Sequence, residues 1–319
     1  MKARLLLCPA LLLLSLQANT QTVAQTDQSS QPKQKVRTVT VPISIFTKKE
    51  LKERRAEEYV QVETLTVKED NEQQQILSIR SVTDTPLTIA ILIQEDLSAG
   101  FNNQLKDIRD FLRSLPQGTR VMIAYLRSGT PQIVQKWTED RELAAKTLRI
   151  VSSSVATAPS SPYDGVNAIL PRFDAIPAGR RAILLFSDGL DTSGGLNVAS
   201  ITQSYDLDQA IIKAQKRSVA VYSFYWPTER TASGNSTLGF AAQGALQKLA
   251  TETGGREFGT GVTEPPGFGQ YFNDLEMTLS RQFALSYIST HMKKGYHAIS
   301  ITSSNPDVKI EHPAGYYYR

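Results

Sequence analysis

The sequence predicts an α/β protein in which a doubly wound, mostly parallel sheet is inserted in a small β unit formed by N- and C-terminal strands. Residues 86–282 alternate apolar strand segments with amphipathic helices, the order typical of crossover units. The segments at 87–93 and 182–187 are apolar without alternation, as in strands that helices cover on both faces. Short alternating segments flank this region and predict the β unit.

The expected β unit rests on segments from both ends of the chain. Between residues 39 and 45, every second residue is apolar, which is the period of a half-buried strand. We expect the strands of the two ends to pair with each other. The segments are Val39–Ile45, Val60–Val67 and Ile76–Val82 before the α/β part, and Leu285–Tyr287, Tyr296–Thr302 and Val308–Glu311 after it.

The α/β part is predicted from hydrophobic periodicity. Its first helix carries apolar residues every three or four positions from Phe101 to Leu115, and Pro116 and Gly118 end it. The expected strands are 87–93, 120–126, 132–137, 182–187, 219–226 and 256–258, and the expected helices are 101–115, 139–151, 166–173, 207–217, 238–249 and 268–283.

The N-terminus has the features of a secretory signal peptide. Lys2 and Arg4 precede an apolar stretch from Leu5 to Leu16 that is too short for a permanent membrane span. The small residues ending at Ala24 fit a cleavage site, and those ending at Ala18 fit a second one less well. We therefore expect a secreted or periplasmic, cell-envelope protein.

These patterns divide the chain into five segments. They are a signal peptide at 1–24, a flexible leader rich in Gln, Ser and Lys at 25–37, an N-terminal β segment at 38–85, the α/β domain at 86–282, and a C-terminal β segment at 283–319 that pairs with 38–85.

Composition argues against several kinds of function. Cys8 is the only cysteine and lies in the expected signal peptide, so the mature chain would have no disulfide and no thiolate. The formal net charge of +4 falls to +2 without Lys2 and Arg4, and no basic stripe suits nucleic acid. No other apolar run is long enough for an integral membrane segment after signal cleavage.

Motifs of nucleotide binding and catalysis are also missing. The loop after the first parallel strand, residues 94–100, lacks both glycine-rich phosphate motifs, and the chain has neither a G-x-S-x-G elbow nor a zinc-type His/Cys cluster. The three histidines, His291, His297 and His312, follow Asp188 in the chain, so a hydrolase using Asp188 and one of them stays an alternative. Alternating strand patterns around His297 and His312 favour ordinary surface or half-buried imidazoles instead.

Oxygen ligands for a hard cation are the remaining site chemistry. Asp96 and Ser98 follow the first parallel strand, Ser160 precedes a helix, and Asp188 follows the strand at 182–187. In an open α/β sheet these turns meet at the carboxyl edge, where such folds hold their ligands. Carboxylates and hydroxyls suit Mg²⁺ or Mn²⁺. We therefore predict a metal site formed by Asp96, Ser98, Ser160 and Asp188.

The same residues carry a resemblance to the von Willebrand factor A-type (VWA) domain, a Rossmann-like doubly wound fold. Phe186-Ser187-Asp188-Gly189 resembles its last metal motif, and Ser160 stands at the Thr position of a second motif. The segments 283–287, 296–299 and 313–317 are similar to a narrower group, the secreted VWA-related proteins abundant in acidobacteria. This resemblance implies a metal-ion-dependent adhesion site (MIDAS) whose cation is completed by a carboxylate of a protein ligand.

One position departs from the family motif. The resemblance implies D-x-S-x-S directly after Ile93, but Gln94 takes the place of the first Asp, and Asp96 and Ser98 take the places of the two serines. Asp96 restores a carboxylate two residues later, on the same side of the chain. Two interpretations follow: a degenerate site that still binds Mg²⁺ or Mn²⁺, or a decayed site whose loop only caps the sheet.

The function expected from these observations is that of an exported, non-enzymatic module for protein–protein interaction or adhesion. Its partner would be a protein or peptide that offers an acidic group to the cation. The polar, glycine-rich loop at 188–195 and the segment 227–237 would form the rim of the binding face. A structural envelope scaffold without metal and an exported hydrolase are the alternatives.

Overall fold

The computed structural model describes residues 35–47, 65–81, 85–153, 159–177, 179–232, 236–261 and 263–318. The expected signal peptide, residues 25–34 of the leader and the first part of the strand expected at 60–67 lie outside the described residues. Within the described ranges, no helix has the length and apolar character needed to cross a membrane.

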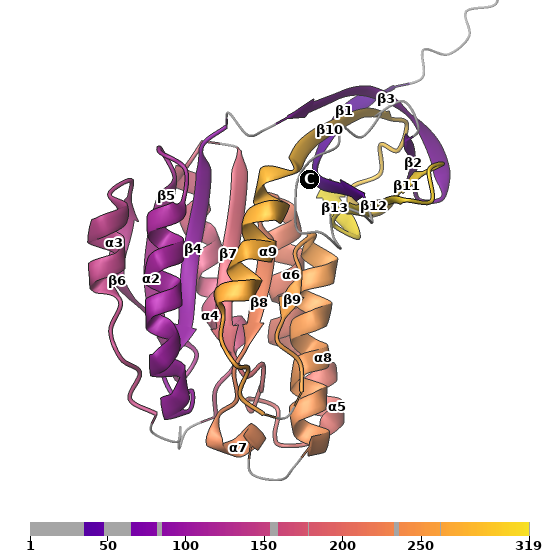
Figure 1. Ribbon diagram of the computed structural model, residues 1–319. Helices are drawn as coiled ribbons and strands as arrows, with labels where there is room; N and C mark the ends of the chain where they lie inside the picture. Colours follow the sequence, from indigo (N-terminus) through magenta and orange to yellow (C-terminus); the bar gives the residue numbers. More distant parts are fainter. Residues whose placement is uncertain are drawn as a thin grey trace, which may run out of the picture. The chain divides into compact units, whose positions relative to one another are not determined.

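A six-stranded sheet forms the centre of the α/β part, with the strand order β6-β5-β4-β7-β8-β9 (Figure 1). All neighbours pair in parallel except β5 and β6, which are antiparallel. β4, the first of these strands in the sequence, lies in the middle of the sheet. The next strands, β5 and β6, extend the sheet on one side of β4, and β7, β8 and β9 extend it on the other. The predicted doubly wound fold class is therefore confirmed. The strands are β4 (Leu87–Gln94), β5 (Arg120–Arg127), β6 (Thr130–Thr138), β7 (Arg180–Ser187), β8 (Ala220–Tyr225) and β9 (Glu257–Phe258).

Helices cover both faces of this sheet, because successive residues of β4 point to opposite faces and both sets are buried. Ile89 and Ile91 belong to one apolar core, with α2, α3 and α9, whereas Ala90 and Leu92 belong to the other, with α4, α5, α6 and α8. The helical segments are η2 (Ala99–Gln104), α2 (Leu105–Ser114), α3 (Arg141–Thr147), α4 (Pro162–Ile169), η3 (Leu170–Ala175), α5 (Val198–Thr202), α6 (Tyr205–Arg217), α7 (Glu229–Ala232), α8 (Ser236–Thr253) and α9 (Gly269–Ser280).

Aromatic side chains pack under the carboxyl edge of the sheet. Phe186 near the end of β7 stacks on Phe224 near the end of β8, with ring centroids 4.7 Å apart. Phe101 meets both Phe186 and Trp226 edge to face at 5.9 Å, and Phe268 closes the cluster. This packing holds the ends of β7 and β8 in place, so the positions of the polar residues that follow these strands are also restrained.

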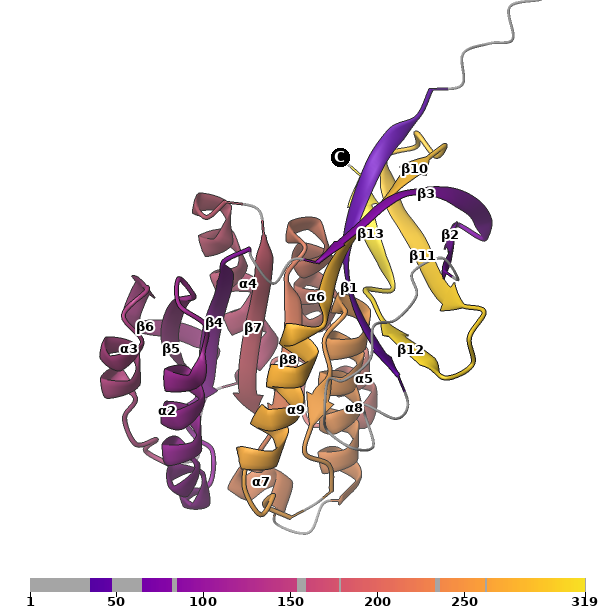
Figure 2. The same cartoon turned by 45° about the horizontal axis from the view of Figure 1, so that its top comes forward.

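Strands from the two ends of the chain form a second sheet, in the order β12-β1-β10-β3-β2-β11-β13 (Figure 2). Every pairing is antiparallel, and in the register of β1 with β10 Val41 lies opposite Leu285. The strands are β1 (Arg37–Thr47), β2 (Leu65–Glu69), β3 (Glu72–Ser81), β10 (Gln282–Ser289), β11 (Gly295–Ser303), β12 (Val308–Glu311) and β13 (Gly315–Tyr318).

Two expected helices are shorter in the structure. The helix expected at 139–151 covers only Arg141–Thr147, and it begins where the carboxylate of Asp140 accepts a hydrogen bond from the Leu143 backbone N–H. The helix expected at 268–283 ends at Ser280, because Gln282 already starts β10. The apolar Phe283 therefore belongs to the strand, and a helix followed directly by a strand leaves no break in the hydrophobic pattern.

Candidate binding site at the carboxyl edge of the parallel sheet

Gln94 and Asp188 meet at the carboxyl edge because their strands, β4 and β7, are neighbours in the sheet. The amide nitrogen of Gln94 donates a hydrogen bond to Asp188 Oδ1 over 3.1 Å. The amide oxygen of Gln94 accepts hydrogen bonds from the Ser187 hydroxyl at 2.5 Å and from the Asp188 backbone N–H at 3.3 Å. Gln94 therefore uses both ends of its amide to hold the Ser187-Asp188 turn.

Two further donors complete the surroundings of Asp188. Its Oδ1 also accepts a hydrogen bond from the Leu190 backbone N–H at 3.0 Å, and its Oδ2 accepts one from the Thr228 hydroxyl at 2.7 Å. Asp188 is only 1% exposed. Burial, followed by the nearby charge of Asp96, raises the pKa of Asp188 to about 6, although its three hydrogen bonds favour the ionised form.

Asp96 and Ser98 lie beside this pair. The Ser98 backbone N–H donates to the Pro227 carbonyl at 3.0 Å, which joins the loop after β4 to the loop after β8. The Ser98 hydroxyl accepts a hydrogen bond from Trp226 Nε1 at 2.8 Å and donates one to Glu264 Oε1 at 2.5 Å. The edge thus gathers the carboxyl groups of Asp96, Asp188 and Glu264.

Ser160 contacts the loop that follows Asp188. Its backbone N–H donates to the Thr192 hydroxyl at 2.8 Å, and its carbonyl accepts from the Thr192 backbone N–H at 2.8 Å. The structure therefore brings Asp96, Ser98 and Asp188 together, and it ties Ser160 to the loop that follows Asp188.

Asp191 is a buried polar centre that the sequence analysis missed. Its Oδ2 accepts hydrogen bonds from the hydroxyls of Ser161 and Ser204, and its Oδ1 accepts from the backbone N–H and hydroxyl of Ser193. Asp191 is 2% exposed. Residues 188–191 are therefore buried rather than on the expected rim, because this half of the loop connects the α4 and α6 N-termini to the strand end.

Gly189 allows this buried path. Its φ is +73°, and a Cβ atom there would lie 2.5 Å from the Ala242 carbonyl oxygen of α8. Its carbonyl accepts a hydrogen bond from the buried hydroxyl of Tyr163 at 2.8 Å. A glycine is therefore required both by the backbone conformation and by the close approach of α8.

The donor types at this edge suit Mg²⁺ or Mn²⁺, but the arrangement around Asp188 does not fit a directly bound ion. Both carboxylate oxygens of Asp188 already accept hydrogen bonds, and the Gln94 NH₂ group presents hydrogen atoms where a first ligand would present oxygen lone pairs. Thr228 and Glu264 contact the same groups. Thr228 belongs to the segment 227–237 expected on the rim, but it is buried and was not predicted as a site residue, and neither was Glu264. They come from loops after β8 and β9, and no local motif marks them.

The three histidines lie in or directly after strands of the second sheet and have their partners there. His297 contacts Asp70, His312 Nε2 accepts from the Ile301 backbone N–H, and His291 lies close to Glu69. In the described part of the chain, neither Asp188 nor Ser98 has a histidine partner. The contact required by a hydrolase with Asp188 is therefore absent.

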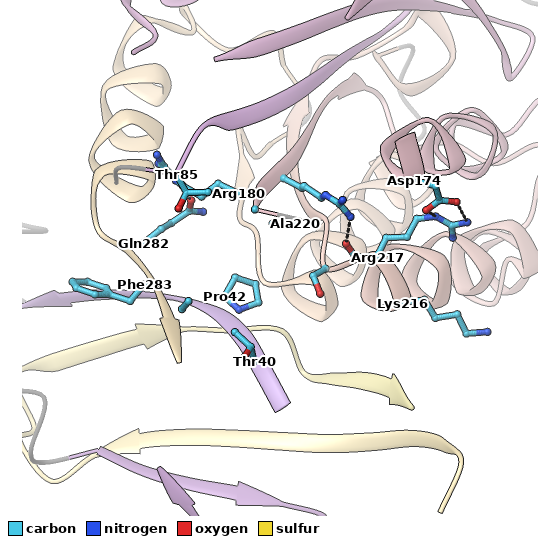
Figure 3. Close-up of a pocket in the computed structure, with 14 residues that line it drawn as sticks. Thr40, Pro42, Thr85, Asp174, Arg180, Lys216, Arg217, Ala220, Gln282 and Phe283 are labelled. Carbon is cyan, nitrogen blue, oxygen red and sulfur yellow. Dashed lines mark hydrogen bonds and ion pairs between the residues drawn. The ribbon is translucent and has the colours of Figure 1, made fainter. Parts of the chain in front are cut away.

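A cavity of about 600 Å³ lies at the other end of the parallel sheet, where β7 begins (Figure 3). Pro42 and Phe283 of the second sheet line it together with the basic residues Arg180, Lys216 and Arg217. Arg180 Nε donates to Gln282 Oε1 at 2.9 Å, and Arg217 is paired with Asp174. This cavity holds none of the site residues predicted from sequence.

No family model and no curated protein matches this chain. Among solved structures, BatB from Bacteroides thetaiotaomicron, described as a conserved hypothetical protein, is 15% identical over 61% of this chain and 97% of that one, with a TM-score of 0.44. An aerotolerance-related membrane protein from Bacteroides fragilis is 13% identical over 60% and 98%, with a TM-score of 0.41. A von Willebrand factor type A structure from Catenulispora acidiphila is 11% identical over 80% and 74%, with a TM-score of 0.43. These are similarities to solved structures at low identity, one of them described as von Willebrand factor type A, and the function of this chain is inferred below from its own geometry.

Proposed function

We propose that this chain is an exported, non-enzymatic protein-binding module that uses the carboxyl edge of a VWA-like sheet without a resident divalent cation. The observation that carries this proposal is the hydrogen bond from the Gln94 amide to Asp188. A neutral amide donor stabilises the buried carboxylate where a cation would otherwise do so. Residues 86–282 are proposed as the binding domain, and the N-terminal signal supports a place in the cell envelope.

Exposed apolar side chains support a protein partner. Leu196 and Phe240 are each 57% exposed and Val198 is 42% exposed. Val198 begins α5 and Phe240 lies in the first turns of α8, two helices that pack against each other. Apolar groups beside a polar, hydrogen-bonded edge are typical of interaction surfaces.

The charge of the edge indicates the chemistry of the partner. Asp96 and Glu264 add negative charge beside Asp188, and Asp96 makes no hydrogen bond within the described residues. Without a cation, a carboxylate of the partner would be repelled here, whereas a lysine or arginine side chain would be attracted. We therefore propose a basic group of the partner in place of the acidic group expected from the family resemblance.

Site-specific photocrosslinking in the producing cell tests this function. A photoreactive residue at Val198 should yield a crosslinked partner, and the same residue at Lys146, on α3 on the other face of the sheet, should not. Adding EDTA to the isolated envelope fraction should leave the Val198 product unchanged. Equal crosslinking from both positions, or loss of the product in EDTA, would contradict the proposal.

A further inference from the structure

Glu69, Asp70 and His297 place three metal-ligating side chains together in the second sheet, far along the chain from the carboxyl-edge residues. Each offers one donor atom, and these atoms all lie within 4.8 Å of one another. His297 Nδ1 lies 2.7 Å from Asp70 Oδ2 and 3.5 Å from Glu69 Oε1. They meet because β11 pairs with β2, where Glu69 lies opposite Ile299, and Asp70 begins the turn to β3.

The orientation of His297 suits a metal ligand. Its Nε2 lies 2.7 Å from the Lys293 carbonyl oxygen, which can only accept, so Nε2 carries a hydrogen. Nδ1 lies at hydrogen-bond distance from Asp70 Oδ2, so it either carries a second hydrogen and donates to Asp70 or, in a neutral imidazole, directs its lone pair at a cation held with the two carboxylates. A histidine whose second ring nitrogen donates to a backbone carbonyl is the usual arrangement of a metal ligand.

Glu69 supplies an independent indication. Its side chain is fully buried, and Oε2 has no hydrogen-bond partner in the described part of the chain. Oε1, in contrast, accepts hydrogen bonds from the hydroxyls of Tyr316 at 2.6 Å and Ser289 at 2.9 Å. Oε1 is thus held in position by its neighbours, whereas Oε2 makes no such hydrogen bond among the described residues, although the hydroxyl of Tyr287 interacts with this carboxylate. A buried carboxylate oxygen without a partner is costly, so Oε2 is the oxygen available to a cation.

The surrounding charges and space are compatible with an ion. Arg37 pairs with Glu69 at 3.3 Å, which balances one of the two carboxylates and leaves one negative charge for a cation. His291 Nδ1 lies 3.7 Å from Glu69 Oε1, has no hydrogen-bond partner among the described residues, and offers a fourth ligand. Asp70, His291 and His297 line a cavity of about 590 Å³ that gives access from solvent.

We propose that Glu69, Asp70 and His297, with His291 as a fourth ligand, form a binding site for a divalent transition metal of the zinc type. One imidazole and two carboxylates are ligands that Zn²⁺ accepts, and ligand atoms around a tetrahedral Zn²⁺ lie about 3.4 Å apart. The distances of 3.5 and 3.7 Å from His297 and His291 to Glu69 Oε1 are close to that value. The 2.7 Å between His297 Nδ1 and Asp70 Oδ2 is a hydrogen-bond distance, so these two groups would move apart to admit the ion, and Glu69 would turn Oε2 toward it. The ion would join β2, β11 and the segment after β10, and so link the two ends of the chain.

Calorimetric titration of Zn²⁺ into the full mature chain, with thermal unfolding in Zn²⁺ and in EDTA, tests the site. The wild type should bind one Zn²⁺ and unfold at a higher temperature when it is bound. Asp70→Asn should weaken Zn²⁺ binding at least tenfold, consistent with the loss of a ligand. Asp70 is exposed and has a φ of +49°, which asparagine also adopts, so this variant should fold.

Three further variants keep the test specific. Asp307→Asn removes an exposed carboxylate from another turn of the same sheet and should bind Zn²⁺ like the wild type. Asp188→Asn should also bind normally, which separates this site from the carboxyl edge. His297→Gln should lose binding. The proposal is overturned if the wild type shows no stoichiometric binding, if Asp70→Asn and His297→Gln bind like the wild type, or if Asp188→Asn abolishes binding.

Discussion

Gln94 donates a hydrogen bond over 3.1 Å to Asp188, a carboxylate that is 1% exposed and has a pKa of about 6. The two residues end neighbouring parallel strands, so the sheet itself holds the pair in place. Because the amide of Gln94 also binds the Ser187-Asp188 turn through its oxygen, a change at either position alters the whole edge.

Asp188→Asn should change the pH dependence of stability. The pKa of Asp188 is raised in the folded state from 3.8 to about 6, so the folded state takes up a proton more readily than the unfolded state between these values. The free energy of unfolding therefore increases as the pH falls from 6 to 4, and Asp188 contributes about 3 kcal/mol to this increase. Urea unfolding at pH 4 and pH 7 should show this increase in the wild type relative to Asp188→Asn.

Comparing the wild type with Asp188→Asn isolates the contribution of Asp188 to the pH dependence of stability. Burial raises the pKa of Glu257 to about 7, but Glu257 contributes equally to both proteins. The asparagine keeps the oxygen that accepts from Gln94 and Leu190, and Thr228 can accept from its amide. An identical pH profile for the wild type and the variant would contradict the assigned environment of Asp188.

Gln94→Asp should convert the edge into a metal site. The new carboxylate repels the carboxylate of Asp188. In EDTA, the variant should therefore be less stable than the wild type by about 2–4 kcal/mol. Mg²⁺ or Mn²⁺ at 100 times its dissociation constant should restore about 2.7 kcal/mol. Thermal unfolding with and without the ions measures both effects.

The wild type is the matched control for that experiment, since the proposed function predicts no stabilisation by Mg²⁺ or Mn²⁺ at its carboxyl edge. A clear rise in the unfolding temperature of the wild type with Mg²⁺, abolished by Asp188→Asn, would favour the degenerate metal site instead.

Gly189→Ala should destabilise the fold far more than Gly118→Ala. Both glycines have a φ close to +75°, at +73° and +77°, so both variants incur the strain of the left-handed region, about 1 kcal/mol. At Gly189 the new Cβ would also lie 2.5 Å from the Ala242 carbonyl oxygen, whereas nothing lies within 4 Å at Gly118. We expect a total loss of about 3 kcal/mol or more at Gly189 in urea unfolding. Equal losses would show that α8 does not pack on this turn.

Ser204→Ala should cost about 2 kcal/mol. The Ser204 hydroxyl caps α6 by accepting from the Leu207 backbone N–H at 3.1 Å, and it also donates to the buried carboxylate of Asp191. Asn197→Ala, which removes the cap of the short and partly exposed α5, should cost no more than about 1 kcal/mol. If the two losses measured by urea unfolding are equal, Asp191 does not depend on Ser204.

The main features of the fold could be predicted because they repeat along the chain. Apolar runs such as 182–187 and the three-and-four spacing from Phe101 to Leu115 are visible locally, and they give the doubly wound sheet. Helix ends such as Ser280 could not be predicted, because apolar residues continue into β10.

The candidate site was less predictable, since its contacts join loops that are distant in sequence. Asp188 and Gln94 could be selected from the strand ends, but Thr228 and Glu264 reach them only through the folded arrangement. The sequence predicts Asp191 only as part of a polar loop, whereas the serines that hydrogen-bond to its carboxylate come from three different turns. His297 shares the inward face of β11 with Ile299 and Ile301, a period of two that marks it as buried and in need of partners.

The antiparallel pairing of β1 with β10 and β12 has a consequence for biosynthesis. The first strand emerges from the ribosome long before β10 and β12, so its hydrogen-bonding groups stay unmatched until those strands arrive. The α/β part can complete its own sheet earlier. A chaperone that shields a lone β-strand would then be needed only during this interval, and a chain truncated before β10 would remain open to aggregation however well its central part folds.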